Sequence, residues 1–342
     1  MGNIKALVID GLLWCALCAL LALGFANHGS LRQYSSVSLR YDAPISGQAA
    51  YAARQYSITR SDGDQFWPVF WKEYRASLES ELAAVKTDCI AYSGDASLVW
   101  PAVYVSGNAP GMKDGAGCAI SEALSWRLWG SSDVVGMTVE VDGDVRVVRG
   151  VFKGTDELAL VPFEDEDTTQ SWTAVELTGG PSDAVRSDAE SYARAAGLGS
   201  PDSTLMRGPS SIAAAMSILP ILVPATYGLA LAIRLAAKRF PLARKPAFYL
   251  SFIMLAVLLP AILGLFPAWV VPTRWSDFQF WLSLLNRAAD GLREFLRAAP
   301  KLRDVELRVL LIKQVAFSFF AVVCGLSICF RWHMNRGIRR DA

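Results

Sequence analysis

The sequence has few of the residue types and patterns on which catalytic and metal sites depend. Its 342 residues include only two histidines, His28 and His333, which excludes a zinc site built from paired histidines. It contains no G-x-x-x-x-G-K-[ST] segment, so the chain carries no ATPase site of the phosphate-binding-loop kind. The G-x-S-x-G and H-E-x-x-H patterns of hydrolases are absent as well. We therefore predict no catalytic, cofactor or metal site, although a spatial pair of carboxylates for glycoside cleavage stays open.

The chain also has no excess of positive or negative charge. The chain has 33 Lys and Arg against 32 Asp and Glu, and the net charge of +1 argues against a nucleic-acid-binding face. At the same time 53% of the residues are hydrophobic and 19% are charged, which is too apolar for an ordinary soluble protein of this length. This composition predicts a membrane protein that also has a large soluble part.

Four hydrophobic stretches are long enough to cross a bilayer, which takes roughly 20 helical residues. They cover residues 6–26, 211–233, 247–271 and 309–330. The first could instead be a cleaved signal peptide, because Lys5 precedes it and the small residues of Gly24-Phe25-Ala26 offer a cleavage point. Its length favours an uncleaved membrane anchor.

Basic residues near the spans predict the orientation. The link 234–246 and the tail 331–342 are rich in Lys and Arg, so both are expected in the cytoplasm. Both termini are then cytoplasmic, whereas 27–210 and the link 272–308 lie outside. The cations of the first link are candidate contacts for an ATPase, although they could equally serve only to set topology against anionic lipid. They are Arg234, Lys238, Arg239, Arg244 and Lys245.

Few ionisable residues lie within the spans. Asp10 lies near the cytoplasmic end of the first, where we favour a carboxylate that reaches the headgroups over a proton relay. The other three spans contain no Asp or Glu. We therefore do not predict an ion or substrate pathway through the membrane.

The segment 27–210 has the pattern of an α+β domain. Apolar residues recur every four positions between Phe66 and Lys86, which predicts a helix there. Two further helices are predicted over 121–129 and 183–196, each followed by a glycine that ends it, Gly130 and Gly197. Predicted strands cover 88–92, 102–106 and 173–177. The expected fold is thus a membrane protein with four transmembrane α-helices and an α+β extracytoplasmic domain inserted between the first and second.

Three local features of this domain allow more specific expectations. Alternating residues on both sides of Asp142-Gly143 predict a β-hairpin with a tight turn. Cys89 and Cys118 are candidates for a disulfide in an oxidising compartment, although both could equally be buried and reduced. The acidic run 164–167 lacks the ligand spacing of a calcium loop and is expected to be a solvated loop.

Part of the domain resembles the extracytoplasmic core domain of MacB-type ABC permeases. The resemblance is carried by the run GCAISEALSWRLWG from Gly117 to Gly130, followed by VGMTV from Val135 and VVRGVF from Val147. VSGN from Val105 and AVEL from Ala174 look similar too, so the match covers roughly residues 89–205. One span, a large outer domain and then three spans is also the arrangement of the MacB and FtsX permeases.

The resemblance implies a permease-like subunit in a bacterial cytoplasmic membrane. Such a subunit passes motion from a separate ABC ATPase to its outer domain and works as a homo- or heterodimer with another permease. The link 234–246 departs from the family, because it is short, basic and broken by proline and lacks an Arg-Glu-Ile-Gly-like coupling sequence. A membrane-anchored binding or sensor module without ATPase coupling therefore stays open as the alternative. The apolar face of the outer link 276–296 is expected to pack under the domain or lie in the interface.

Overall fold

The computed structural model describes most of the chain. It covers residues 2–34, 36–59, 65–180, 186–205, 216–224, 226–228 and 301–338, together with 279, 282–283, 286, 289–290 and 293. The chain divides into two compact units. Unit 1 comprises Met1–Arg32, Gly208–Ala289 and Glu306–Ala342, and unit 2 comprises Gln33–Arg207 and Asp290–Val305.

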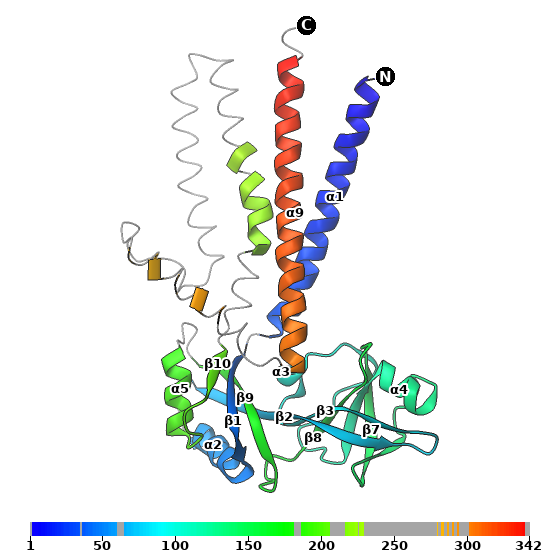
Figure 1. Cartoon of the computed structure of the whole chain (residues 1–342), viewed down its shortest axis with the longest axis vertical. Helices are drawn as coiled ribbons and strands as arrows, with labels where there is room; N and C mark the ends of the chain where they lie inside the picture. Colours follow the sequence, from blue (N-terminus) through cyan, green and yellow to red (C-terminus); the bar gives the residue numbers. More distant parts are fainter. Residues whose placement is uncertain are drawn as a thin grey trace. The chain divides into compact units, whose positions relative to one another are not determined.

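Among the described residues, two helices are long and apolar enough to cross a membrane. Helix α1 covers Gly2–Arg32, and helix α9 covers Leu302–Ile338, with its first four residues in unit 2 and the rest in unit 1 (Figure 1). They contain the predicted first and fourth spans. A shorter apolar helix covers Met216–Gly228 within the predicted second span. The predicted third span, 247–271, lies outside the described residues, so four spans stay a prediction.

The described strands of unit 2 form one ten-stranded sheet. Its order is β10-β1-β9-β2-β3-β8-β5-β7-β4, and β6 pairs with both β2 and β7. Neighbours are antiparallel except β3 with β8 and β5 with β7, which are parallel. The strands are β1 Val37–Ser46, β2 Phe66–Glu79, β3 Ala84–Ser93, β4 Tyr104–Gly107, β5 Gly117–Ser121, β6 Thr138–Val141, β7 Asp144–Phe152, β8 Leu158–Pro162, β9 Ser171–Gly179 and β10 Ser203–Leu205. The helices are α2 Gly47–Thr59, α3 Ala96–Val99, α4 Glu122–Trp129 and α5 Arg186–Ala195, so unit 2 has the predicted α+β class.

The predicted helix between Phe66 and Lys86 is wrong. These residues form most of β2 and the start of β3, which pair with each other from Phe70 opposite Ser93 to Glu79 opposite Ala84. A four-residue repeat of apolar residues is also a multiple of the two-residue strand period, so the same spacing fits one face of a strand. Only the first half of β2 is covered on both faces, where Val69 and Trp71 are buried like Phe70, so the two-residue alternation appears only in the second half of the strand.

Several other predictions are confirmed by their capping and turn geometry. Helix α4 begins where the Ser121 hydroxyl accepts a hydrogen bond from the Leu124 amide at 3.2 Å, and it ends at Gly130, whose φ is 67°. The β6–β7 hairpin turns through Asp142 and Gly143, whose φ values are 49° and 94°. The predicted strands 88–92 and 173–177 lie within β3 and β9, and the strand at 102–106 is β4, which begins two residues later. The helix that stops before Gly197 is α5. The sequence patterns did not reveal β1, α2, α3, β8 or β10.

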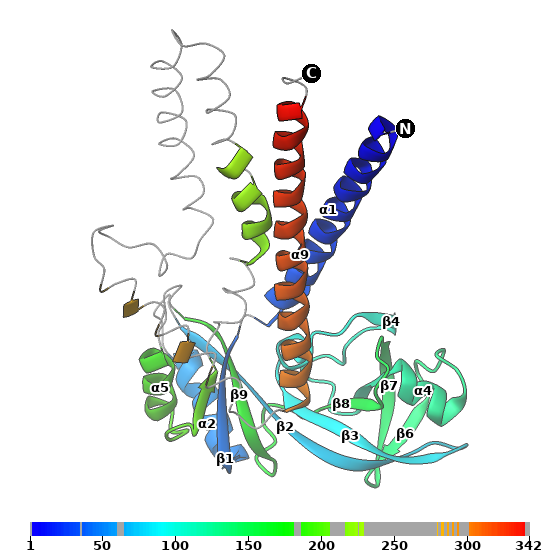
Figure 2. The ribbon, with the colours of Figure 1, turned by 45° about the horizontal axis from the view of Figure 1, so that its top comes forward.

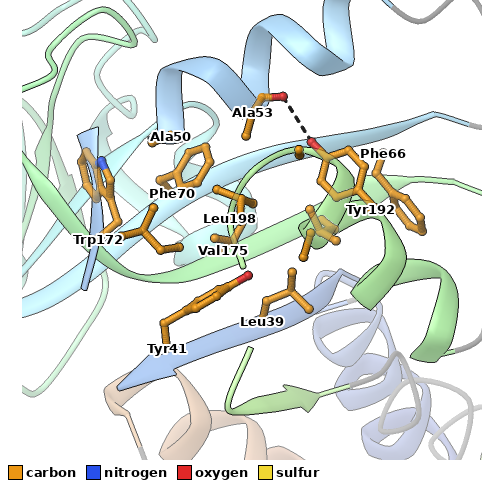
Figure 3. Packing of buried hydrophobic residues seen from close by; sticks show 14 of the residues in the cluster. Leu39, Tyr41, Ala50, Ala53, Phe66, Phe70, Trp172, Val175, Tyr192 and Leu198 are labelled. Atoms are coloured by element: carbon orange, nitrogen blue, oxygen red, sulfur yellow. Dashed lines mark hydrogen bonds between the residues drawn. The ribbon is translucent and has the colours of Figure 1, made fainter. Parts of the chain in front are cut away.

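One part of the core lies between the sheet and the helices α2 and α5, which cover the same side of β1 and β9 (Figures 1 and 2). Figure 3 shows aromatic residues of β2 and β9 packing against aliphatic residues of β1 and small residues of α2. The Tyr192 hydroxyl of α5 donates to the Ala53 carbonyl of α2 at 3.4 Å, so the two helices are also joined to each other. Residues labelled in this cluster include Leu39, Tyr41, Ala50, Phe66, Phe70, Trp172 and Val175.

Candidate functional site

A cluster of buried charges lies where the first turn of α9 joins the sheet of unit 2. It consists of Arg40 on β1, Glu176 on β9, and Arg303 and Asp304 on α9, and these four residues are called the charge cluster below. Their side chains are 8%, 0%, 4% and 3% exposed, respectively. Charged side chains are almost never buried to this degree unless they are paired.

The charge cluster is balanced, with two cations and two anions in alternation. The Arg40 Nη2 atom lies 2.8 Å from Asp304 Oδ1 and 3.9 Å from Glu176 Oε1. The Arg303 Nη1 atom lies 3.2 Å from the same Glu176 oxygen. Each sheet residue therefore bonds to a residue of the α9 turn, and Glu176 also joins the two cations. Buried ion pairs of this kind fix geometry strongly, since removal of one partner leaves an uncompensated charge.

Strand alternation explains how Glu176 comes to face the helix turn. Residues of β1 and β9 pair antiparallel, with Ser38 directly opposite Glu176, so both side chains point to the same face of the sheet. The carboxylate accepts hydrogen bonds from Ser36 Oγ at 2.6 Å, Ser38 Oγ at 2.5 Å and Trp71 Nε1 at 3.0 Å. Glu176 is thus held by three neutral donors of the sheet side in addition to Arg303.

The start of α9 is bonded to the sheet by further groups. The Leu302 amide donates to Glu73 Oε1 of β2 at 2.6 Å, and the Lys301 amide donates to Asp304 Oδ2 at 3.3 Å. The Lys301 ammonium donates to Thr173 Oγ1 of β9 at 2.8 Å. Amides at the beginning of a helix have no partner within the helix, so these acids satisfy donors that would otherwise be buried and unpaired.

Burial and charge shift the pKa values around the charge cluster in different directions. Burial and the nearby Arg40 lower the pKa of Lys301 to about 8, against the attraction of Glu73, Asp304 and Glu176. Burial would raise the pKa of Glu176, but the attraction of Arg303 and Arg40 and the serine hydrogen bonds hold it below its usual value. Glu176 is therefore ionised at neutral pH.

The guanidinium groups also stack on aromatic rings. The guanidinium carbon of Arg40 lies 4.5 Å from the centroid of the Trp71 ring, and that of Arg303 lies 5.1 Å from the Tyr34 ring. Within the described part of the chain, Arg40 Nε and Nη1 and Arg303 Nε have no hydrogen-bond partner. Packing against Trp71 and Tyr34 therefore helps to hold both arginines.

This arrangement suits mechanical attachment rather than catalysis. Both acids of the charge cluster are neutralised by arginines and are closed off from solvent, so neither is available to a substrate. Among the residues that the structure describes, no group of three or more His, Cys, Asp or Glu side chains could hold a metal ion. What the site does is bond the first turn of a long apolar helix to β1, β2 and β9.

The structure tests only some of the predicted site residues. The candidate ATPase contacts Arg234, Lys238, Arg239, Arg244 and Lys245 all lie outside the described residues, so their role stays a prediction. The amphipathic face of 276–296 falls mostly outside them too.

The two candidate disulfide cysteines are free thiols in the structure. Both Cys89 and Cys118 are fully buried in one hydrophobic cluster. Strand β8 lies between the strands that carry them, β3 and β5. Adjacent strands are about 4.8 Å apart, so β3 and β5 are separated by about twice that distance. This exceeds the roughly 7 Å that the two Cα atoms of a disulfide can span. Of the two alternatives for Cys89 and Cys118, the structure has two buried, reduced thiols.

The acidic run 164–167 is partly fixed rather than fully solvated. Asp165 pairs with Arg54 Nη1 of α2 at 3.0 Å and accepts a hydrogen bond from Ser93 Oγ at 2.8 Å. The Arg54 guanidinium also donates to the Ser93 carbonyl at 2.7 Å. One carboxylate of the run therefore ties its loop to α2 and the end of β3.

The charge cluster itself was missed at the sequence level. A single acid within the apolar strand run around Ala174-Val175-Glu176-Leu177 was the available signal, since an ionised side chain there must find a partner. Its partner Arg303 is more than a hundred residues away and belongs to a link with many charges. Sequence spacing alone therefore could not predict that Glu176 and Arg303 are paired.

Comparison with known proteins gives structural similarities only. The structure is similar to the extracellular domain of the ABC-type transporter YknZ from Gram-positive bacteria, with 16% identity, a TM-score of 0.40, and coverage of 49% of this chain and 96% of that one. It is similar to the periplasmic region of MacB from Actinobacillus actinomycetemcomitans, with 11% identity, a TM-score of 0.39, and coverage of 48% of this chain and 85% of that one. Neither a family model nor a curated protein sequence matches the chain.

Proposed function

We propose that this chain is a permease-like subunit of a MacB/FtsX-type ABC system, which transmits motion driven by a separate ATPase to its extracytoplasmic domain. The observation that carries the proposal is the charge cluster at the start of α9. This helix is continuous over Leu302–Ile338, and its first turn is bonded to two strands through buried ion pairs. The first turn of a candidate membrane helix is thus bonded directly to the sheet of the outer domain.

Continuity of the helix makes it suitable for transmission. At a rise of 1.5 Å per residue, the 37 residues of α9 correspond to about 55 Å, which exceeds the thickness of a bilayer. Displacement of the far end of a rigid helix reaches its first turn without a flexible connection. Because Arg303 and Asp304 bond to different strands, Glu176 on β9 and Arg40 on β1, the displacement is applied to both strands at once.

The remaining parts of the proposal concern topology and partners. The basic residues of the link 234–246 and of the C-terminal tail support a cytoplasmic location for both, and four spans then put the N-terminus on the same side. Lys238 and Arg239 are there available to an ATPase. The chain functions in a bacterial cytoplasmic membrane as a homo- or heterodimer with another permease. It performs no catalysis of its own, and the ATP hydrolysis belongs to the partner.

Affinity purification of the tagged full-length protein from its native membrane in mild detergent, followed by mass spectrometry, tests this proposal. We expect a stoichiometric protein with a phosphate-binding loop, and we expect its recovery to fall several-fold in the correctly inserted variant K238Q/R239Q. The matched control is K86Q/K113Q, which neutralises two lysines of unit 2 instead. Recovery of an envelope protein without any ATPase would overturn the proposal in favour of a membrane-anchored binding module.

A further inference from the structure

Unit 1 contains a buried polar contact between its membrane helices. The Asn27 amide of α1 donates to the Gln314 side-chain oxygen of α9 at 2.9 Å and to the Leu310 carbonyl at 2.9 Å. Gln314 in turn donates to Ser217 Oγ of the 216–228 helix at 2.9 Å. Asn27 is 9% exposed and Gln314 is 1% exposed. A buried amide pair of this kind fixes the axial register of two apolar helices, since sliding one helix along the other would leave the amide donors unpaired.

A second polar contact joins the same two helices at their other ends. Arg331 Nε of α9 lies 2.6 Å from Asp10 Oδ1 of α1, and both side chains are about one-third exposed, at 32% and 38%. Asp10 lies seventeen residues before Asn27, and Arg331 lies seventeen residues after Gln314. Equal spacing on two antiparallel helices means that both contacts are satisfied by a single register. Seventeen residues correspond to about 26 Å of helix, close to the thickness of the hydrocarbon core.

The two contacts differ in how closely the helices approach. In Figures 1 and 2, α1 and α9 lie side by side toward the C-terminal end of α1 and separate toward the ends marked N and C. Near the close end, a Cβ atom at Gly24 would lie 3.8 Å from the Cβ atom of Phe317, in ordinary contact. Near the open end, the long Arg331 side chain reaches Asp10.

We propose that Asn27–Gln314 and Asp10–Arg331 form a two-point register lock, which makes α1 and α9 one antiparallel element of the membrane unit. The Asn27–Gln314 hydrogen bond fixes the axial register of the two helices where they lie close together, near the C-terminal end of α1. The Asp10–Arg331 ion pair limits their separation at the opposite end. Asp10 is thereby assigned a positioning role in place of either the snorkelling or the proton-relay role that its sequence position allows. The pairing of the helices does not depend on ATPase coupling.

The close end is tested by a disulfide in the full-length protein in native membranes. Gly24→Cys with Phe317→Cys, made after replacement of the native cysteines, has the 3.8 Å Cβ separation that a disulfide requires. The matched control keeps native Cys324 as the only thiol partner of Gly24→Cys, two helical turns further along α9. We expect the first pair to cross-link under mild oxidant at least tenfold faster than the control. Equal rates, or faster cross-linking of the control pair, would overturn the register.

The open end is tested by the distance between spin labels at Leu12→Cys and Phe330→Cys, two exposed positions beside the ion pair. We expect Asp10→Asn to broaden the distance distribution and the swap D10R/R331D to narrow it again. The variant Arg32→Gln, which neutralises a different cation of α1, is the matched control and should change nothing. The Gly24–Phe317 cross-link verifies correct folding in each variant. A distribution unchanged by Asp10→Asn, or not restored by the swap, would overturn the role of the ion pair.

Discussion

At the scale of single residues, Glu176 is the centre of the account because five hydrogen-bonding or cationic groups from three parts of the chain surround it. Two are the arginines Arg40 and Arg303, and the others are two serines of the β1 region and Trp71. Its side chain has no exposed surface. Removal of one partner costs far more at a fully buried acid than at a surface pair, because it leaves an uncompensated charge that water cannot reach.

Glu176→Gln should therefore destabilise unit 2 by about 3–5 kcal/mol, since two buried arginines lose their shared counter-charge. Hydrogen exchange of β1 and β9 amides in the full-length protein measures this. Glu140→Gln, at an exposed position of β6, should change the same quantity by no more than about 0.5 kcal/mol. A loss as small as that of the control would show that the cluster does not hold the strands.

Lys301 gives the region a pH dependence at alkaline pH. Its pKa is near 8 in the folded protein and 10.5 in the unfolded chain, so between these values the unfolded state binds more protons. The free energy of unfolding therefore rises with pH between pH 8 and pH 10.5, by at most about 1.4 kcal/mol per pH unit. Below pH 8 Lys301 is protonated in both states and adds no pH dependence. Urea unfolding followed by tryptophan fluorescence should show this slope in the native protein relative to Lys301→Met. Parallel curves for the two proteins between pH 8 and 10 would contradict it.

The thiols of unit 2 allow a direct chemical check of the sheet order. Burial raises the pKa of Cys89 and of Cys118 to about 12 each, so neither is a thiolate at neutral pH. Both should resist maleimide in the folded protein, and both should be alkylated after denaturation without reductant. Peptide mass spectrometry that found the two joined by a disulfide would contradict the placement of β8 between them.

At the scale of elements, local signals in the sequence were reliable where a turn or cap demands a particular residue. Gly130 and the Asp142-Gly143 turn have backbone dihedrals that few other residues adopt, so their positions could be predicted. The region of β2 was misread because burial of both faces in its first half removed the alternation there, and the four-residue repeat further along fits a strand face as well as a helix. Strand β1 and helix α2 were not predicted because their character comes from pairing with β9 and packing on its core.

Replacement of Gly130 by alanine measures how much its backbone conformation matters. We expect Gly130→Ala to lower the free energy of unfolding by about 1 kcal/mol. The backbone φ of 67° is the cause, since an added Cβ atom would meet no other atom within 4 Å. Gly111→Ala is the matched control, since Gly111 also has open space but no left-handed φ, and it should be near neutral. Thermal unfolding of the two full-length variants gives the comparison. Equal melting temperatures would mean that the left-handed cap contributes nothing.

At the scale of the whole molecule, the sequence predicted the class of protein better than its functional contacts. Span length and basic flanks depend on local composition, so the α+β domain and two of the membrane helices could be read from residue patterns. The charge cluster joins residues 40, 176, 303 and 304, whose proximity depends on the complete strand order. No single stretch of sequence contains that information. The same holds for Asp10 and Arg331, at opposite ends of the chain.

The most direct test of the central claim is hydrogen exchange of the full-length protein together with the ATPase that the proposed function expects to co-purify, with and without ATP and vanadate. If α9 transmits motion through the charge cluster, peptides covering 36–41, 173–177 and 301–306 should change their exchange together when ATP is trapped. In the Glu176→Gln variant, the change in 301–306 should persist, and 173–177 should follow it less than in the native protein because β9 loses its ion pair with Arg303. A change in the helix turn that never reaches β1 or β9 in the native protein, or no ATP-dependent change in any of the three segments, would contradict the account.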